Sequence, residues 1–220
     1  MNITCIIPTK GNSRRVPNKN IRILGGKPLI EYTLIEIQKS IYINKTYVST
    51  DSKNIIDCAS QYPVEIIKRP RCLCKPEVTT EEVIIHALDK IELPDYVVVL
   101  YATSPFRKCY HIDALIEKVL KNGADSGQSI SELKQRTGSY DGVHYTYDFR
   151  SSEYDMTKLE PIYVENSGIY VLKPELLIDG MVMYGKKHVG YVMKEPYDLD
   201  INTWIDWATA FVIKYKEWAE

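Results

Sequence analysis

The sequence lacks the features that are typical of membrane-spanning, nucleic-acid-binding and secreted proteins. No apolar run approaches the roughly 18 residues that a membrane-spanning helix needs. The 28 Lys and Arg residues nearly balance the 29 Asp and Glu residues, so we do not expect a dedicated nucleic-acid binder. The first residues, MNITCIIPTK, have no charged segment followed by a long apolar stretch, so we do not expect a secretory signal.

Cysteines are few, and they do not form a pattern that predicts cross-links or metal binding. An odd number of scattered cysteines does not make a disulfide framework. Cys72 and Cys74 form a CxC pair, but no second pair lies at zinc-finger spacing. We therefore expect free thiols and a cytoplasmic protein. The five cysteines are Cys5, Cys58, Cys72, Cys74 and Cys109.

Several common catalytic motifs are also missing. The chain contains no GxSxG, no HExxH, no Walker motif and no GxGxxG fingerprint. Hydrolase-type nucleophiles, zinc proteases and the best-known nucleotide-binding loops are therefore not indicated. The chemistry must come from residues that lie outside these motifs.

What the chain does contain is an alternation of short apolar strands and amphipathic helices. The predicted strands are Ile3–Ile7, Lys45–Ser49, Val64–Ile67, Tyr96–Leu100, Ile169–Leu172 and Val189–Met193. The predicted helices are Leu29–Lys39, Asn54–Tyr62, Thr79–Ile91, His111–Lys121 and Ile205–Ala219. Such alternation is typical of an α/β fold with a mostly parallel, doubly wound sheet.

We expect a single domain over residues 1–220, interrupted by one excursion. Thr79 or Thr80 can cap the third helix, with Glu82 near its N3 position. The stretch from Ser126 to Pro161 is polar and has little helical period. It predicts an excursion at about 126–165, in the form of a hairpin arm or a lid.

A basic loop follows the first predicted strand. Closely spaced cations repel one another unless an anion lies among them, and a glycine lets the backbone approach a ligand. A polyphosphate is the obvious anion, because ligands of α/β sheets gather at the carboxyl ends of strands. A solvated basic turn is the alternative. The loop residues are Lys10, Gly11, Asn12, Ser13, Arg14, Arg15 and Lys19.

Polar residues also follow two other predicted strands. Ser49-Thr50-Asp51 is more typical of a helix cap than of a ligand site. The segment from Tyr101 to Arg107, which includes Thr103 and Ser104, predicts a tight loop. Arg107 could bind a carboxylate or phosphate in two-pronged fashion, or it could be exposed beside a capped turn.

Asp198 and Asp200 form a DxD pair near the C-terminal helix. In an extended segment these carboxylates would point the same way, and their repulsion would favour a cation between them. Mg²⁺ prefers oxygen ligands and commonly combines carboxylates with substrate phosphates. An acidic turn before the helix is the alternative.

Taken together, these blocks resemble the acylneuraminate cytidylyltransferase family, the CMP-sialic acid synthetase group. The resemblance spans Ile6 to Trp207 in the family's order. Its blocks are IIPTKGNSRRVPNKNIRILGGKPLIEYTL, YVSTDSKNIIDCA, KRPRCL with TTEEVIIHAL, LYATSPFR, ENSGIYVLKPELL and DLDINTWIDW.

The resemblance implies a Rossmann-like nucleotidyltransferase fold, a homodimer with an extended arm, and Mg²⁺ as cofactor. It implies transfer of CMP from CTP to an acidic, nonulosonic acid-like sugar, with pyrophosphate released, as in surface polysaccharide biosynthesis. By position, the catalytic residues would be Lys19, Arg14 and Asp200. The nucleotide would be held by Lys10, Gly11, Asn12, Ser13, Asn20 and Arg69. The acceptor would lie near Tyr101, Thr103, Ser104, Arg107 and Asn166, and the metal near Asp198 and Asp200.

Departures from the family pattern leave alternatives open. Tyr101 stands where the family has a Gln that faces the sugar, and the arm is short and lacks a basic run. The acceptor could instead be an octulosonate, a phosphonate or a phosphorylated alcohol. A nucleotide-binding relative without catalysis is a further alternative, although the retention of both Asp198 and Asp200 argues against it.

Overall fold

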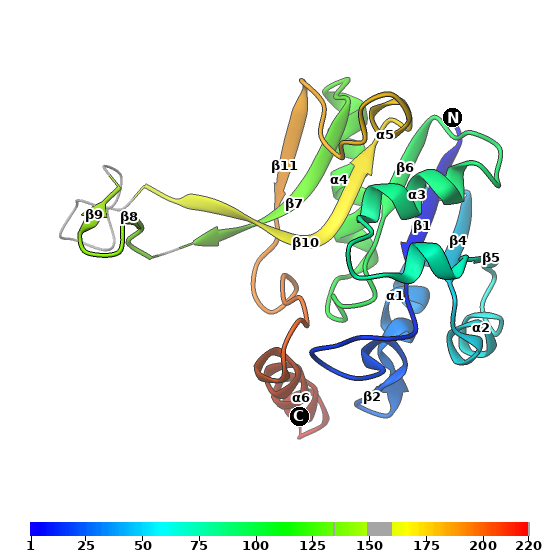
Figure 1. Cartoon of the computed structure of the whole chain (residues 1–220), viewed down its shortest axis with the longest axis horizontal. Helices are drawn as coiled ribbons and strands as arrows, with labels where there is room; N and C mark the ends of the chain where they lie inside the picture. The colour runs from blue at the N-terminus through cyan, green and yellow to red at the C-terminus, as the bar shows by residue number, and fades with distance from the viewer. Residues whose placement is uncertain (134, 149–159, 220) are drawn as a thin grey trace.

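The computed structural model describes residues 1–133, 135–148 and 160–219. Its central feature is a seven-stranded sheet with the strand order β11-β7-β10-β6-β1-β4-β5 (Figure 1). Neighbouring strands are parallel except for the two pairs that β10 forms. The mostly parallel α/β sheet predicted from the sequence is therefore confirmed. The strands are β1 (Ile3–Pro8), β4 (Lys45–Thr50), β5 (Glu65–Lys68), β6 (Tyr96–Val99), β7 (Ser126–Leu133), β10 (Ile162–Leu172) and β11 (His188–Val192).

Helices cover both faces of this sheet (Figure 1). The covering helices are α1 (Leu29–Ile37), α2 (Lys53–Ala59), α3 (Thr80–Leu88), α4 (Cys109–Lys121) and α5 (Glu175–Gly180). The C-terminal helix α6 (Trp204–Ala219) lies beyond the end of the sheet, where Ala210 packs in a cluster with Leu24 and Phe106 (Figure 1). Short 3₁₀ turns, η1 (Lys19–Ile21) and η2 (Arg71–Cys74), and a small β2–β3 ribbon (Ile23–Leu24 and Lys27–Pro28) complete the body. Among the helices of the described residues, none has both the length and the apolar character needed to cross a membrane.

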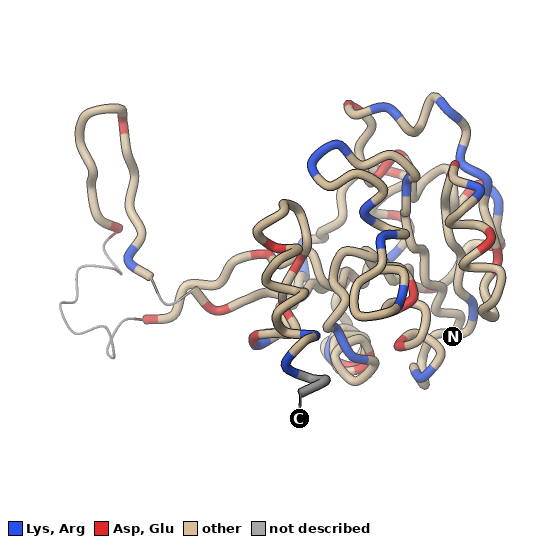
Figure 2. The backbone as a smooth tube through the Cα atoms, turned by 90° about the horizontal axis from the view of Figure 1, so that it is seen from below, with Lys and Arg blue, Asp and Glu red and all other residues tan. Residues whose placement is uncertain are grey.

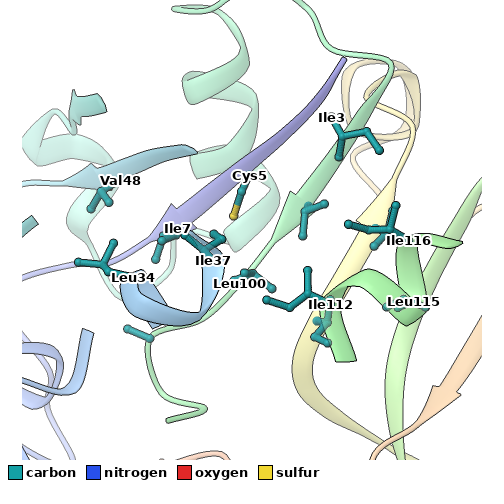
Figure 3. Packing of buried hydrophobic residues seen from close by; sticks show 14 of the residues in the cluster. Ile3, Cys5, Ile7, Leu34, Ile37, Val48, Leu100, Ile112, Leu115 and Ile116 are labelled. Atoms are coloured by element: carbon teal, nitrogen blue, oxygen red, sulfur yellow. The ribbon is translucent and has the colours of Figure 1, made fainter. Parts of the chain in front are cut away.

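The core forms on both sides of β1 because its side chains alternate in direction. Cys5 and Ile7 face α1 and α4, where they pack with residues such as Leu34 and Ile112 (Figure 3). Ile6 faces the opposite side and packs in the cluster that contains Ala87 of α3. A strand buried on both faces is apolar along its whole length, which is why this run could be recognised in the sequence.

The start of α3 confirms the predicted cap. The Thr79 hydroxyl accepts a hydrogen bond from the Glu82 backbone N–H at 3.3 Å. The Glu82 carboxylate accepts one from the Thr79 backbone N–H at 2.7 Å. This reciprocal pair is a capping box, and it fixes the helix start beside the cavity described below.

The predicted excursion at about 126–165 is wrong at both ends. β7 begins at Ser126 and β10 begins at Ile162, and the two strands pair within the central sheet. The polar composition of β7 concealed it, because its buried serines find partners inside the sheet. Ser126 Oγ contacts His188 Nδ1 at 2.7 Å, and Ser129 Oγ donates to Asn166 Oδ1 at 2.6 Å.

An arm does exist between these strands. β8 (Gly138–Tyr140) and β9 (Tyr145–Tyr147) form a hairpin that projects from the body at the end of β7 and β10 (Figure 1). Within residues 135–148 the charged side chains are Arg136, Asp141 and Asp148, so this part of the arm has no basic run (Figure 2). The remainder of the predicted arm, 149–159, lies outside the described residues.

Candidate active site at the carboxyl ends of the strands

A cavity of about 340 Å³ opens where β1, β5 and β6 end. Four cations line it, namely Lys10, Lys19, Arg69 and Lys75. Other lining residues that the sequence predicted are Ser13, Asn20, Tyr101, Thr103 and Asp200. Residues of the basic loop and Asp200 of the acidic segment therefore line the same cavity.

The loop after β1 is held in place by β4. Asp51 accepts a hydrogen bond from the Gly11 backbone N–H at 2.8 Å, so the prediction of Asp51 as a helix cap is wrong. A Cβ on Gly11 would lie 2.7 Å from the Ser52 Cβ, so the glycine permits close approach to protein rather than to a ligand. The contacts of Gly11 shape the loop, and neither Gly11 nor Asn12 is among the cavity's lining residues.

The same loop also lines an adjoining depression of about 260 Å³. Arg14 and Arg15 lie there, together with Lys10, Ser13 and Lys19. Asn20 ties the loop to η1, because its side-chain amide donates to the Lys10 carbonyl at 3.0 Å. The cations are thus spread along two connected depressions, over a length that suits an extended anion.

Arg69 brings a buried cation to the cavity from the end of β5. Only 5% of its surface is exposed. Its guanidinium donates to the Ser49 carbonyl at 2.8 Å and to the Ser49 hydroxyl at 3.3 Å. Burial lowers its pKa, and the nearby Cys74 and Asp51 oppose that shift. A guanidinium held by neutral acceptors keeps donors for a ligand.

Lys19, from the N-terminal part of the chain, and Asp200, from the C-terminal part, line the same cavity. Lys19 Nζ donates to the Ile201 carbonyl, which joins the loop to the acidic segment. Burial lowers the pKa of Lys19, and the Asp200 carboxylate opposes this effect. One Asp200 oxygen accepts from the Asn202 amide, and the other, Oδ1, is buried with no hydrogen-bond partner in the part of the chain that the structure describes.

Asp198 does not share the cavity with Asp200. It lies in a turn at 195–198, so the extended geometry assumed for the DxD pair is wrong. Its Oδ2 accepts a hydrogen bond from the Ser131 hydroxyl at 2.7 Å. It lines a separate depression of about 510 Å³ near the base of the arm. In a turn, side chains two residues apart no longer point the same way.

The loop after β6 contributes Tyr101 and Thr103 to the cavity. The Tyr101 hydroxyl donates to the Thr80 hydroxyl at 3.0 Å, and burial raises the pKa of Tyr101 to about 12. The Thr103 carbonyl accepts from the Ile201 backbone N–H at 2.8 Å, which places the acidic segment beside this loop. Ser104 is buried behind the cavity rather than lining it.

Arg107 is not placed to bind a ligand, which corrects both readings from the sequence. Only 1% of its surface is exposed. Its guanidinium donates to the Gly168 carbonyl at 2.6 Å and to the Thr33 hydroxyl at 2.8 Å. Burial lowers its pKa to about 10. Arg107 therefore joins the β6 loop to α1 and β10 from within the core.

Asn166 is likewise engaged by protein. Its Oδ1 accepts from Ser129 Oγ and from the Gly168 backbone N–H at 3.1 Å, and its Nδ2 donates to Ser131 Oγ at 3.0 Å. These bonds stabilise an irregularity in β10, where the register shifts between Glu165 and Tyr170. Asn166 thus holds the backbone that presents its neighbour Ser167, which has a φ of 55°, to the cavity.

Sequence reasoning missed several lining residues. They are Lys75, Thr79, Thr80, Ser167 and Asn202. The capping signal of Thr79 was recognised, but nothing in it indicated a ligand site. The orientation of Ser167 follows from the irregular backbone of β10, which side-chain patterns do not predict.

The chain is similar to known proteins over most of its length. A family model described as cytidylyltransferase matches residues 4–210. The chain is 32% identical over 219 residues to the CMP-N,N'-diacetyllegionaminic acid synthase of Legionella pneumophila, with 94% of each protein covered. It is 28% identical over 211 residues to an N-acylneuraminate cytidylyltransferase of Streptococcus agalactiae, which covers 90% of this chain. The chain spans about half the length of that relative, because the match covers 50% of it.

Solved structures show the same fold. The CMP:2-keto-3-deoxy-manno-octonic acid synthetase complexed with CTP has a TM-score of 0.75 at 12% identity, covering 99% of this chain and 100% of that one. The 4-diphosphocytidyl-2C-methyl-D-erythritol synthase of Anaerococcus prevotii has a TM-score of 0.70 at 14% identity, covering 96% and 97%. The Rossmann-like nucleotidyltransferase fold is confirmed, and the extensive family match shows that the chain belongs to the cytidylyltransferase family.

Proposed function

We propose that this chain transfers CMP from CTP to an acidic sugar of the nonulosonic acid class and releases pyrophosphate. The observation that carries the proposal is the cavity in which Lys10, Lys19 and Arg69 lie opposite Asp200. A triphosphate needs several cations along its length, and the two connected depressions supply them. The names of the curated relatives support CTP and a nonulosonic acid as the substrates.

In this proposal the acceptor oxygen attacks the α-phosphorus of CTP, and the bond to the pyrophosphate oxygen breaks. The chain's task is to position the reactants and to stabilise the charge that develops on the leaving group. Lys10, Lys19 and Arg14 bind the triphosphate, and Lys19 is oriented by the Ile201 carbonyl. The cytidine lies toward Asn20 and Arg69, whose side chains are already fixed by hydrogen bonds to the protein.

The residues present fit a magnesium ion through Asp200 rather than through a symmetrical DxD pair. The buried, unpartnered Oδ1 of Asp200 is the free oxygen ligand at the cavity, and Mg²⁺ commonly uses one carboxylate together with substrate phosphates. Asp198 is held by Ser131 and supports the segment from the other side. When bound, the ion would offset negative charge on the phosphates.

Tyr101 lines the cavity as a hydrogen-bond donor and does not act as a base. Burial raises its pKa to about 12, so its hydroxyl stays protonated at neutral pH, and it donates to Thr80. Its side chain lines the cavity beside Thr103. This position gives Tyr101 a part in orienting the acceptor.

Two further proposals concern the protein as a whole. The projecting β8–β9 hairpin exposes Tyr140, Tyr145 and Tyr147, which supports a homodimer formed through the arm. All five cysteines are free thiols, which supports the reducing environment of the cytoplasm. The CMP-sugar product would then serve surface polysaccharide biosynthesis.

The function is tested by a pyrophosphate-release assay with CTP and a panel of acceptors. The panel contains N-acetylneuraminic acid, N,N'-diacetyllegionaminic acid and 2-keto-3-deoxy-manno-octonic acid, and UTP replaces CTP as the nucleotide control. We expect release that requires CTP and is fastest with a nonulosonic acid. Binding of CTP without release from any acceptor would support a non-catalytic nucleotide binder instead.

A further inference from the structure

A second cavity of about 340 Å³ adjoins the one described above. Thr80 and Tyr101 line both, so the two cavities share a wall. Tyr101 meets Tyr170 of β10 edge to face, with ring centroids 6.0 Å apart and an interplanar angle of 87°. Tyr101 therefore separates the two cavities, Tyr170 contacts it from the side of the second, and a ligand longer than the first cavity would extend past Tyr101.

The chemistry of the second cavity is opposite in sign to that of the first. Glu81, in the first turn of α3, and Glu165, just before the irregularity of β10, both line it. Met181 and Met183 form an apolar side. None of its described lining residues is Lys, Arg or His, so nothing among them offsets the two carboxylates.

The position of Glu165 is set by protein contacts. The Tyr170 hydroxyl donates to the Glu165 carboxylate, and the edge-to-face contact with Tyr101 orients the Tyr170 ring. Glu165 remains on the surface of the protein rather than in its core, so a ligand can reach it. A carboxylate fixed in this way presents its charge to whatever enters the cavity.

We propose that the second cavity receives the part of the acceptor far from the reacting carbon, and that it selects an acceptor with a positively charged substituent there, such as a protonated amine. Glu165 and Glu81 are the specificity-determining residues. This inference rests on the proposed function and deepens it. In this arrangement the reacting end of the acceptor lies on the CTP side of Tyr101, and its far end meets the carboxylates of the second cavity.

The test uses two matched pairs of acceptors. N-glycylneuraminic acid is compared with N-glycolylneuraminic acid, which has a hydroxyl in place of the ammonium, and 9-amino-9-deoxy-N-acetylneuraminic acid is compared with its 9-hydroxy parent. For each pair we measure kcat/KM for pyrophosphate release at neutral pH, and affinity by calorimetric titration, which needs no turnover. We expect the wild-type chain to favour the ammonium acceptor roughly fivefold in at least one pair.

Charge-neutral variants assign the preference to the cavity. Glu165→Gln keeps an oxygen that can accept from Tyr170, so it removes charge with little change in packing. We expect Glu165→Gln or Glu81→Gln to bring the ratio of kcat/KM for the ammonium acceptor to kcat/KM for the neutral acceptor toward one. Glu117→Gln, on the exposed face of α4, should leave this ratio unchanged.

The outcomes separate the two proposals. Ratios near one in both pairs, by rate and by affinity, would overturn this inference and leave the proposed function standing. A preference that persists in both Glu variants would overturn it as well. If no acceptor supports release, the proposed function fails, and the calorimetric ratios still decide whether the cavity selects a positive charge.

Discussion

Replacing Arg107 by Met tests whether this residue stabilises the protein or binds a ligand. The guanidinium contacts the Gly168 carbonyl, the Thr33 hydroxyl and the Tyr101 carbonyl, and it is almost fully buried. Its Met variant would fill much of the volume but donate nothing. The sequence alone allowed a ligand-binding role, so the experiment distinguishes two different assignments.

The expected loss follows from the acceptors that remain. Each buried polar group left without a partner costs about 1–3 kcal/mol. The Tyr101 carbonyl keeps a hydrogen-bond donor in the variant, because the Thr33 hydroxyl lies 3.4 Å from it. The Gly168 carbonyl loses its hydrogen bond from Arg107, which is 2.6 Å long in the wild-type chain. Burying a guanidinium has its own cost, which the variant relieves in part. We expect a net loss of about 2 kcal/mol in the free energy of unfolding, or roughly 4–8 °C in Tm.

The assay is urea unfolding monitored by circular dichroism, with the exposed Arg71 changed to Met as the control. Arg107→Lys should recover little stability, because one ammonium cannot reach acceptors on α1 and β10 together. If Arg107→Met instead kept the unfolding midpoint of the wild-type chain while KM for the acceptor rose sharply, Arg107 would be a ligand-binding residue. The structural assignment would then be wrong.

Three further predictions concern charge at the site and in the core. Asp200→Asn should lower kcat for pyrophosphate release about a hundredfold or more while CTP binding by calorimetry changes little, and near-normal release would remove Asp200 from the metal site. Burial lowers the pKa of Lys19 from 10.5, so this ammonium loses its proton at a lower pH than a free lysine does. The affinity for CTP should therefore begin to weaken below pH 10.5 as the pH rises, and Lys19→Met should remove this part of the pH dependence. Burial lowers the pKa of His111 from 6.5 to about 4, and its neutral ring accepts from the Lys108 backbone N–H. Since the unfolded chain binds a proton that the folded chain excludes, stability should fall by about 3 kcal/mol as the pH drops from 6.5 to about 4, and urea titrations of His111→Asn should lack this loss.

Local patterns in the sequence predicted most of the fold. Apolar runs such as Ile3–Ile7 identify strands buried on both faces, and the Thr79–Glu82 pair identifies the start of α3. These signals act between residues that are close in the chain, so no tertiary information is needed to read them. β7 escaped detection because its serines are buried as members of hydrogen-bonded pairs, and the partners, His188 and Asn166, lie far away in the sequence.

The site was predicted in composition more than in arrangement. Lys10 and Lys19 of the first loop do line one cavity with Asp200, whereas Arg14 and Arg15 lie in the adjoining depression. Arg107 and Asn166, which have the same chemistry as ligand-binding residues, bind the protein's own backbone and side chains instead. A residue type shows what a side chain can bind, but its accessibility depends on which other elements cover it.

By itself, the sequence determined the alternation of strands and helices, the family, and the charged residues available to the first cavity. Only the tertiary structure decided which of those charges face the cavity, because the turn at 195–198 separates Asp198 from Asp200 and the irregular β10 brings Ser167 inward. It also placed Glu81 and Glu165, which are far apart in the chain, in one acidic cavity beside Tyr101. The physical reason is that secondary structure follows from short-range backbone and packing preferences, whereas a binding site is formed by long-range contacts among segments whose packing brings their ends together.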